Sequence, residues 1–253
     1  PKVISVDIPS GLDPSTGLSL GDTIKADFTV MCLTRKQGCY TGEAAEFVGN
    51  LKFVDLGLEK KISKIEGSSE ILTIDSNTFN YRSKIAHKGN YGNVLVLGGW
   101  DDMEGAAFLA ALASLKSGAG KVFICGPERE NIPYEIIRLE KNISDIKKIL
   151  PEIDCIVAGP GLGKNGNSFL EEIWNTKVPL VLDADALRWL SHKKVRKRNS
   201  FFCGTPHMGE AFSLIGKRKK DRFEIISDLK KYYGGVWVLK GAGTIILNDN
   251  LYV

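Results

Sequence analysis

Glycine-rich or acidic turns follow five apolar runs from residue 93 onward, and their residue types suit the binding of a phosphate or another polar ligand. Lys240 stands immediately before a glycine-rich turn, which places one cation and several backbone amides beside a phosphate. His207 and Glu210, at an expected helix start, can hydrogen-bond a substrate and a metal-bound water. The five turns are Gly98–Ala107, Gly159–Gly163, Asp183–Leu187, Thr205–Glu210 and Lys240–Thr244. Each turn alone is a weak signal, whereas five in this order after strands are a strong one.

Each turn also has a structural explanation. The Gly105–Ala107 segment can open a helix whose amides face an anion, but tight packing of a helix on a sheet explains its small residues equally well. The Gly-Pro-Gly turn that contains Gly161 can hold a ligand or simply be rigid. Asp183 and Asp185 can orient a Mg²⁺-bound phosphate or cap a helix. For His207, the position after a strand-ending Thr-Pro favours a functional role.

Apolar runs alternate with helical patterns from residue 93 onward, which predicts parallel βαβ units in a three-layer α/β/α sandwich. The expected strands are Asn93–Leu97, Val122–Cys125, Cys155–Ala158, Leu180–Leu182, Phe201–Cys203 and Val236–Leu239, and the expected helices include Ala106–Leu115, Phe169–Trp174 and Phe223–Tyr233. Ligands of such sheets bind beyond the carboxyl ends of the strands. We therefore expect the five turns to share one edge of the sheet.

The first part of the chain has a different organisation. Residues 1–57 contain three expected strands, Val3–Asp7, Asp27–Leu33 and Lys52–Asp55, and a Pro-Ser-Gly turn at Pro9–Pro14. Residues 58–86 read as a polar connector, and residues 87–253 as the second domain. The chain opens on a strand and stops inside a β-rich stretch, so we expect an internal piece of a longer protein.

Composition narrows the functional class. The chain has 253 residues, a net charge of +4 and 43% hydrophobic residues, and none of its apolar runs reaches the length of a membrane helix. We interpret two basic runs, at residues 193–198 and 217–222, as solvated helix ends rather than a nucleic-acid site, because no aromatic residues interleave with them. Five scattered cysteines without a CxxC indicate a reducing cytoplasm, with Cys125 and Cys155 as buried apolar groups and no disulfide framework or zinc site.

The turns and their order resemble the ADP- or ATP-dependent NAD(P)H-hydrate dehydratases, which have a ribokinase-like fold with a mostly parallel central sheet. The matching segments are HKGNYGNVLVLGGWDDMEGAA (87–107), SGAGKV (117–122), GPGLG (159–163), DADAL (183–187), TPHMGE (205–210) and VLKGAGT (238–244). The first part resembles the tail of a Rossmann-like NAD(P)H-hydrate epimerase domain through SVDIPSGLDPSTG (5–17), KADFTV (25–30) and VDLGL (54–58). The resemblance implies a bifunctional repair enzyme that epimerises the R and S hydrates of NADH and NADPH. It further implies dehydration of the S form, with cleavage of ADP or ATP and release of AMP and phosphate.

The resemblance also implies roles for individual residues. Gly105, Ala106, Ala107, Gly161 and His207 would contact the hydrated cofactor, and Lys240, Gly241, Ala242, Gly243 and Thr244 would bind the nucleotide, which carries Mg²⁺. In the epimerase part Asp7 would contact the cofactor and Ser10 would be a ligand for potassium, although Asp7 could instead cap the Pro-Ser-Gly turn. The dehydratase base is expected beyond Val253, so we expect this chain to turn over poorly or not at all. We also expect a cytoplasmic homo-oligomer that binds neither nucleic acid nor a membrane.

Two other functions fit the same fold. One is a ribokinase-like kinase for a small alcohol or vitamin precursor, and the other is a nucleotide-binding remnant without turnover. The combination of GPGLG, DADAL and TPHMGE favours the repair enzyme, because it resembles the dehydratases more than the sugar kinases.

Overall fold

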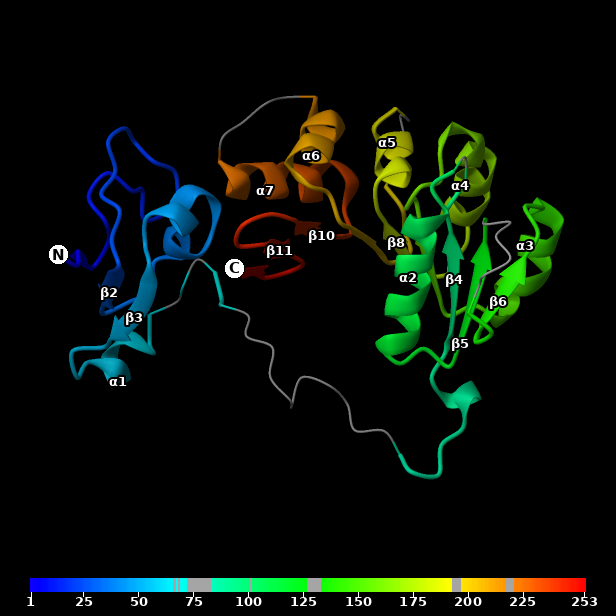
Figure 1. Cartoon of the computed structure of the whole chain (residues 1–253), viewed down its shortest axis with the longest axis horizontal. Helices are drawn as coiled ribbons and strands as arrows, with labels where there is room; N and C mark the ends of the chain where they lie inside the picture. The colour runs from blue at the N-terminus through cyan, green and yellow to red at the C-terminus, as the bar shows by residue number, and fades with distance from the viewer. Residues whose placement is uncertain are drawn as a thin grey trace.

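The N-terminal part of the chain forms a small parallel sheet. The computed structural model describes residues 1–65, 67, 69–71, 83–100, 102–126, 133–192, 197–216 and 221–253 (Figure 1). The sheet has the order β1-β2-β3, with β1 at Ile4–Val6, β2 at Phe28–Cys32 and β3 at Asn50–Val54. Two 3-10 helices, η1 (Gln37–Tyr40) and η2 (Gly42–Glu46), lie between β2 and β3. A small core of Leu12, Met31, Cys39, Ala44 and Val48 holds this part together.

The second sheet has nine strands in the order β12-β11-β10-β9-β8-β7-β4-β5-β6. Its strands are β4 (Asn93–Leu97), β5 (Lys121–Cys125), β6 (Ile136–Leu139), β7 (Cys155–Ala158), β8 (Leu180–Leu182), β9 (Phe202–Gly204), β10 (Val236–Leu239), β11 (Ile245–Leu247) and β12 (Leu251–Tyr252). The strands from β10 to β6 pair in parallel, while β11 is antiparallel to both of its neighbours. The edge strand β12 also pairs with the connector, since Glu70 N donates to Leu251 O at 2.8 Å.

Helices cover both faces of the large sheet. Alternation along β4 separates the two faces: Leu95 and Leu97 point into the main core, whereas Val96 packs with Ala107 and Ala111 of α2 (Glu104–Lys116). The main core also takes side chains from α3 (Ile143–Ile149), α4 (Asn167–Trp174), α5 (Asp185–His192), α6 (Met208–Ile215) and α7 (Arg222–Tyr233). The predicted three-layer α/β/α sandwich is confirmed.

Most predicted strands agree with the structure within one or two residues. The prediction missed β6 and described the segment of β11 and β12 only as β-rich; these strands have two to four residues each and show no clear alternation. The 58–86 connector holds the short helix α1 (Glu59–Ile62), and residues 66, 68 and 72–82 of this predicted segment lie outside the described residues.

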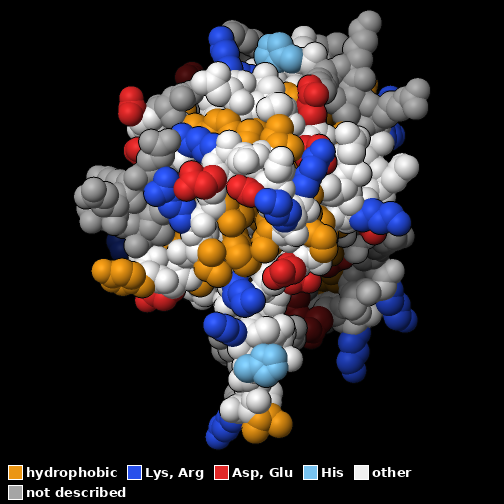
Figure 2. All heavy atoms as spheres, turned by 90° about the vertical axis from the view of Figure 1, so that its right-hand side faces the viewer, with side chains coloured by type: hydrophobic (Ala, Val, Ile, Leu, Met, Phe, Trp, Pro, Cys, Tyr) orange, Lys and Arg blue, Asp and Glu red, His pale blue; other side chains and the backbone are white. Residues whose placement is uncertain are grey.

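The interpretation of the basic runs needs one correction. Residues 193–196 and 217–220 lie outside the described residues, but Arg222 is buried, with 6% of its surface exposed, rather than solvated. On the face that carries β6 and α3, positive and negative side chains are interspersed around an apolar patch (Figure 2). Within the part of the chain that the structure describes, no helix is both long and apolar enough to cross a bilayer.

Candidate functional site

The five turns lie in a row at the carboxyl edge of the large sheet. They follow β4, β7, β8, β9 and β10, which are consecutive neighbours in the strand order. Backbone hydrogen bonds join neighbouring turns: Trp100 N donates to Gly161 O at 2.7 Å, and Lys240 N donates to Pro206 O at 2.9 Å. The sheet topology therefore assembles segments about 140 residues apart along the chain (Gly98 to Lys240) into one edge.

At one end of this row, Gly161 lies against the start of α2. Its φ is +59°, and a Cβ at this position would lie 2.7 Å from Met103 Cβ and 3.4 Å from Ala106 Cβ, so glycine is required. Gly105 is exposed and has open space beside it, while Ala106 is half-buried. Ala107 is fully buried in the core beneath α2, so its methyl group packs inside the protein.

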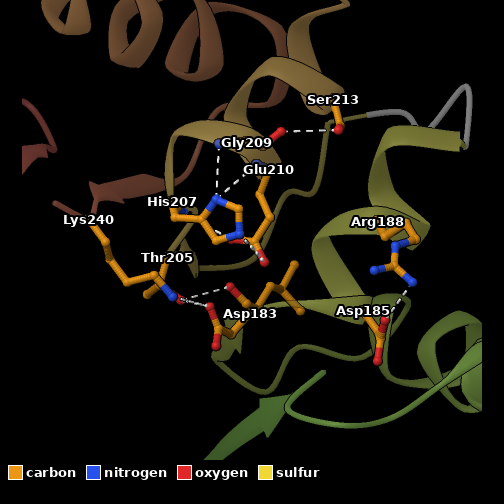
Figure 3. Close-up of polar contacts among 10 residues, drawn as sticks. Asp183, Asp185, Arg188, Thr205, His207, Gly209, Glu210, Ser213 and Lys240 are labelled. Atoms are coloured by element: carbon orange, nitrogen blue, oxygen red, sulfur yellow. Dashed lines mark hydrogen bonds and ion pairs between the residues drawn. The ribbon is translucent and has the colours of Figure 1, made fainter.

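His207 caps the N-terminus of α6 with its side chain. Nδ1 accepts from Gly209 N at 2.9 Å and from Glu210 N at 3.3 Å, and Glu210 Oε2 accepts from His207 N at 2.9 Å (Figure 3). This capping box leaves Nδ1 unprotonated and places the ring proton on Nε2, 3.6 Å from Glu210 Oε1. The ring is 61% exposed, so Nε2 is accessible to a ligand.

Two cavities flank Arg188 of α5. The smaller, about 210 Å³, is lined by Ala184, Arg188, His207, Gly209, Glu210 and Ser213. The larger, about 390 Å³, is lined by Gly163, Lys164, Asn167, Glu171, Asp185, Arg188, Trp189 and His192. Asp185 accepts from Gly163 N at 2.9 Å and pairs with Arg188, the residue common to both linings, at 3.0 Å.

Lys240 and Asp183 form an ion pair between the turns after β10 and β8. Lys240 Nζ lies 2.7 Å from Asp183 Oδ1, which also accepts from Thr205 Oγ1 at 2.9 Å (Figure 3). The Lys240 side chain is 42% exposed and that of Asp183 28%. The carboxylate of Asp183 is thus held by neighbouring turns, and the lysine ammonium remains accessible from solvent.

The glycine-rich turn after Lys240 is exposed from Gly241 to Thr244. Gly241 has a φ of +147° and Gly243 a φ of +60°, conformations that favour glycine. Behind the turn lies Arg222, which the sequence interpretation placed in a solvated run. One signal could have identified it: a cation at the first position of a helix is electrostatically unfavourable and needs another reason to be there.

Comparison with known proteins identifies the family. The family model described as NAD(P)H-hydrate dehydratase matches residues 94–253. The chain belongs to the NAD(P)H-hydrate dehydratase family. A second family model, described as the YjeF-related protein N-terminus, matches residues 1–38 of this family member.

Relatives of this dehydratase-family chain are longer proteins. The bifunctional NAD(P)H-hydrate repair enzyme of Coxiella burnetii is 35% identical over 267 residues, which cover 98% of this chain and 54% of that protein. The corresponding enzyme of Escherichia coli is 34% identical over 257 residues, covering 96% of this chain and 50% of that protein. The chain therefore spans about half the length of these relatives.

Solved structures agree with the family assignment. The ADP/ATP-dependent NAD(P)H-hydrate dehydratase from Bacillus subtilis, co-crystallised with ATP/Mg²⁺, is 31% identical with a TM-score of 0.57, covering 69% of this chain and 68% of that chain. A ribokinase-like superfamily protein from Enterococcus faecalis has a TM-score of 0.62 at 21% identity, covering 68% of this chain and 66% of that chain. The second likeness shows the fold alone, and together they confirm the ribokinase-like architecture.

In the N-terminal part of the chain, Asp7 follows β1 with a φ of +72°, a strained conformation for a residue other than glycine. Its Oδ1 accepts from Cys32 N at 3.0 Å and pairs with Lys36 Nζ. The hydrogen bond from Lys36 holds the pKa of Asp7 below its ordinary value. The carboxylate is thus engaged with β2 and the loop after it. Ser10 is exposed, and its carbonyl oxygen accepts from Ile24 N at 2.9 Å.

The described metal-ligating side chains of this family member do not cluster, and two of its thiols are buried. Among the described residues, no group of three or more His, Cys, Asp or Glu side chains could hold a metal ion. Burial raises the pKa of Cys39 to about 11 and that of Cys125 to about 12, so neither thiol is ionised near neutral pH. Cys125 lies buried in β5, which confirms its predicted role as an apolar core residue, whereas Cys155 of β7 is only partly buried.

Proposed function

We propose that the chain dehydrates the S form of hydrated NADH or NADPH at the expense of ADP or ATP, within a protein that also epimerises the R and S hydrates. The row of five turns carries this proposal, because it sets an accessible lysine and exposed amides at one end and small residues at the other. Family membership and the names of the relatives support it. In this proposal residues 1–57 belong to the epimerase domain and residues 87–253 to the dehydratase domain. Residues 58–86 connect the two domains.

The nucleotide would occupy the Lys240 end of the row. Lys240 can exchange Asp183 for a phosphate oxygen, because both side chains are partly exposed. The exposed turn from Gly241 to Thr244 would contact the rest of the nucleotide. Mg²⁺ is commonly held by one or two carboxylates together with substrate phosphates, and Asp183 is the carboxylate beside Lys240. The Bacillus subtilis relative was co-crystallised with ATP/Mg²⁺, which supports a Mg²⁺-bound nucleotide as a ligand of this chain.

The hydrated nicotinamide would lie toward Gly161 and Ala106. Glycine at residue 105 leaves room for a flat ring close to the backbone, and glycine at residue 161 lets the turn after β7 approach the start of α2. His207 would donate a hydrogen bond from Nε2, since Nδ1 already accepts from the α6 amides. Ala107 would act through its backbone, because its side chain is buried.

The chemistry follows from the leaving group. Hydroxide leaves poorly, so the terminal phosphoryl group of the nucleotide is first transferred to the hydrate hydroxyl, which releases AMP when ADP is the donor. The carbon–oxygen bond then breaks with loss of phosphate, and loss of a ring proton restores the double bond. A ribokinase-like fold suits this sequence, because it holds a hydroxyl in line with a nucleotide phosphate.

Roles in the epimerase part stay predictions. Asp7 would contact the cofactor, although its carboxylate already pairs with Lys36. Ser10 would bind potassium, and its exposed position in the turn after β1 leaves its hydroxyl reachable from solvent. A homo-oligomeric state and the lack of nucleic-acid and membrane partners are likewise predictions.

Chemically hydrated NADH is the substrate for the decisive experiment. A protein that contains this chain and has the full length of its relatives is incubated with it in the presence and absence of ADP, and recovery of NADH is followed by absorbance. We expect recovery that depends on ADP. Absence of recovery together with phosphoryl transfer from ATP to small alcohols would favour the kinase, whose fold this chain shares. Tight ADP binding without either reaction would identify a remnant without turnover.

A further inference from the structure

A buried arginine holds the glycine-rich turn from behind. Arg222, the first residue of α7, donates from Nη1 to Ala242 O at 2.6 Å and to Gly243 O at 2.9 Å. Its Nη2 donates to Leu239 O at 3.0 Å and to Lys240 O at 3.3 Å. The guanidinium thus gathers four carbonyl oxygens of one short segment on the same side.

This arrangement determines where the amides of the turn point. In a planar trans peptide the C=O of one residue and the N–H of the next point in opposite directions. Because the carbonyl groups of Lys240, Ala242 and Gly243 face Arg222, the N–H groups of Gly241, Gly243 and Thr244 face away from it. Residues 241–244 are exposed, so these three amides are directed toward solvent. Backbone amides that a glycine-rich turn presents to solvent can bind an anion.

The N-terminal part of the chain completes the same arrangement. Thr41 is 1% exposed; its Oγ1 donates to Gly243 O at 2.7 Å and accepts from Arg222 Nη1 at 2.8 Å. Gly42 N donates to Ala242 O at 3.1 Å. A Cβ on Gly243 would lie 1.8 Å from Tyr40 O, so the two segments are in close contact. Figure 1 shows the N-terminal part beside α7 and β11.

We infer that Arg222 and Thr41 are positioning residues for the nucleotide site, and that the N-terminal part is a structural component of that site. The inference rests on the proposed function, because it assigns the nucleotide to the Lys240–Thr244 turn. Thr41 and Arg222 contact the carbonyl side of the turn, while the nucleotide phosphate would take its amide side. The buried guanidinium also places a positive charge behind the phosphate. Loss of either residue should therefore weaken nucleotide binding without removing any ligand contact.

The test measures ADP affinity by titration calorimetry in the full chain. Thr41→Val removes one buried hydroxyl and should weaken ADP binding about fivefold, the effect of one buried hydrogen bond. Thr41→Ser keeps the hydroxyl and should restore the affinity. Arg222→Lys loses the planar fork and should weaken ADP binding about tenfold or more. In the turnover assay, the KM for the nucleotide should rise and that for the hydrate should not.

The chain offers matched controls for both changes. Thr29 is a fully buried threonine of β2 whose Oγ1 donates to Val48 O at 2.7 Å, away from the turn. Arg198 donates to the carbonyl oxygens of Ile173, Trp174 and Val178, also away from the turn. Thr29→Val and Arg198→Lys should lower the unfolding temperature and leave ADP affinity unchanged.

The outcomes separate this inference from the proposed function. Wild-type affinity in Thr41→Val, or equal losses in Thr41→Val and Thr29→Val, would overturn the inference and leave the proposed function intact. ADP binding that depends on Thr41, in a protein that does not restore NADH, would sustain the inference and overturn the dehydratase. A wild-type chain that binds neither ADP nor ATP would overturn both. If Arg222→Lys does not fold, the comparison of Thr41→Val with Thr29→Val alone tests the inference.

Discussion

The two sheets of the molecule each place a lysine–aspartate pair where a parallel strand ends. Asp7 follows β1 directly and pairs with Lys36, and Asp183 follows β8 directly and pairs with Lys240. The two pairs differ in which side chain is the more exposed. In the N-terminal pair the lysine is 18% exposed and the aspartate 43%, whereas in the second pair the lysine is 42% exposed and the aspartate 28%.

We propose that this difference separates a pair that mainly stabilises the fold from one that is available to a ligand. Lys36 also donates to Cys32 O at 2.7 Å, so its ammonium is held between Asp7 and the end of β2. Lys240 stands at an exposed glycine-rich turn and can exchange its carboxylate partner for a phosphate. In this proposal the same residue types at the same kind of position have different roles, according to whether the lysine or the aspartate is the less exposed.

The largest expected effect comes from breaking the contact between the two parts of the chain. Gly243→Ala should destabilise the protein by about 2–4 kcal/mol, because the left-handed φ costs about 1 kcal/mol and the clash with Tyr40 O adds about 1–3 kcal/mol. Gly216→Ala is the matched control, since its φ of +65° is similar but nothing lies within 4 Å of its Cβ position. Urea unfolding of both variants checks this. Equal destabilisation would show that the clash with Tyr40 is relieved at no cost.

Removal of either lysine tests the comparison of the pairs directly. Lys240→Ala should weaken ADP binding about 10- to 100-fold, the effect of losing a charge-assisted hydrogen bond. Lys36→Ala should leave ADP affinity unchanged and lower the unfolding temperature. Titration calorimetry with ADP measures the first effect and calorimetric unfolding the second. Unchanged ADP affinity in Lys240→Ala would remove Lys240 from the nucleotide site.

His207 tests whether one side chain can both stabilise the fold and bind a ligand. His207→Ala removes the cap of α6 and should cost about 1 kcal/mol of stability, whereas His207→Asn keeps a cap. Both variants lose the Nε2 donor, so both should raise the KM for hydrated NADH more than that for ADP. Steady-state kinetics and thermal unfolding separate the two roles. A normal KM for the hydrate in His207→Asn would leave His207 with the cap alone.

The smallest effect is expected at Asp7. Its folded pKa is lowered from 3.8, so the pair with Lys36 stabilises the fold fully above that value and progressively less as the pH falls through the folded pKa. Because the side chain is 43% exposed, screening keeps the contribution below about 1 kcal/mol. Asp7→Asn should therefore be slightly less stable than the wild type at pH 7, and the gap should close in acid. Urea unfolding at pH 7 and at an acidic pH measures this difference in stability, and a difference that grows in acid would contradict the pairing.

The sequence predicted the large sheet well because its central strands are apolar runs bounded by turn residues. The strands at Asn93–Leu97, Cys155–Ala158 and Leu180–Leu182 have the predicted bounds. Because the carboxyl ends of parallel strands meet at one edge of a sheet, the five turns after these strands could be predicted to lie at that edge. The short strands β11 and β12 escaped prediction, since hydrogen bonds to β10 and to Glu70 define them more than any hydrophobic pattern does.

The sequence could not predict the environment of Arg222. Its neighbours from Lys217 to Lys220 are basic, so composition indicated a solvated helix end. Burial of this side chain depends on four backbone carbonyls and on Thr41, 181 residues away along the chain. Local patterns carry no information about such a contact.

The hydrogen bond between Thr41 and Gly243 spans 202 residues, and this separation has a consequence for folding. Contacts between segments far apart in the sequence have the largest entropic cost of loop closure, so they form after local βαβ units. The glycine-rich turn should therefore gain its final geometry only after both sheets exist. In refolding experiments, recovery of the tryptophan fluorescence from the buried core should precede the capacity to bind ADP. ADP binding that returned before the core fluorescence would show that the turn reaches its geometry without the N-terminal part.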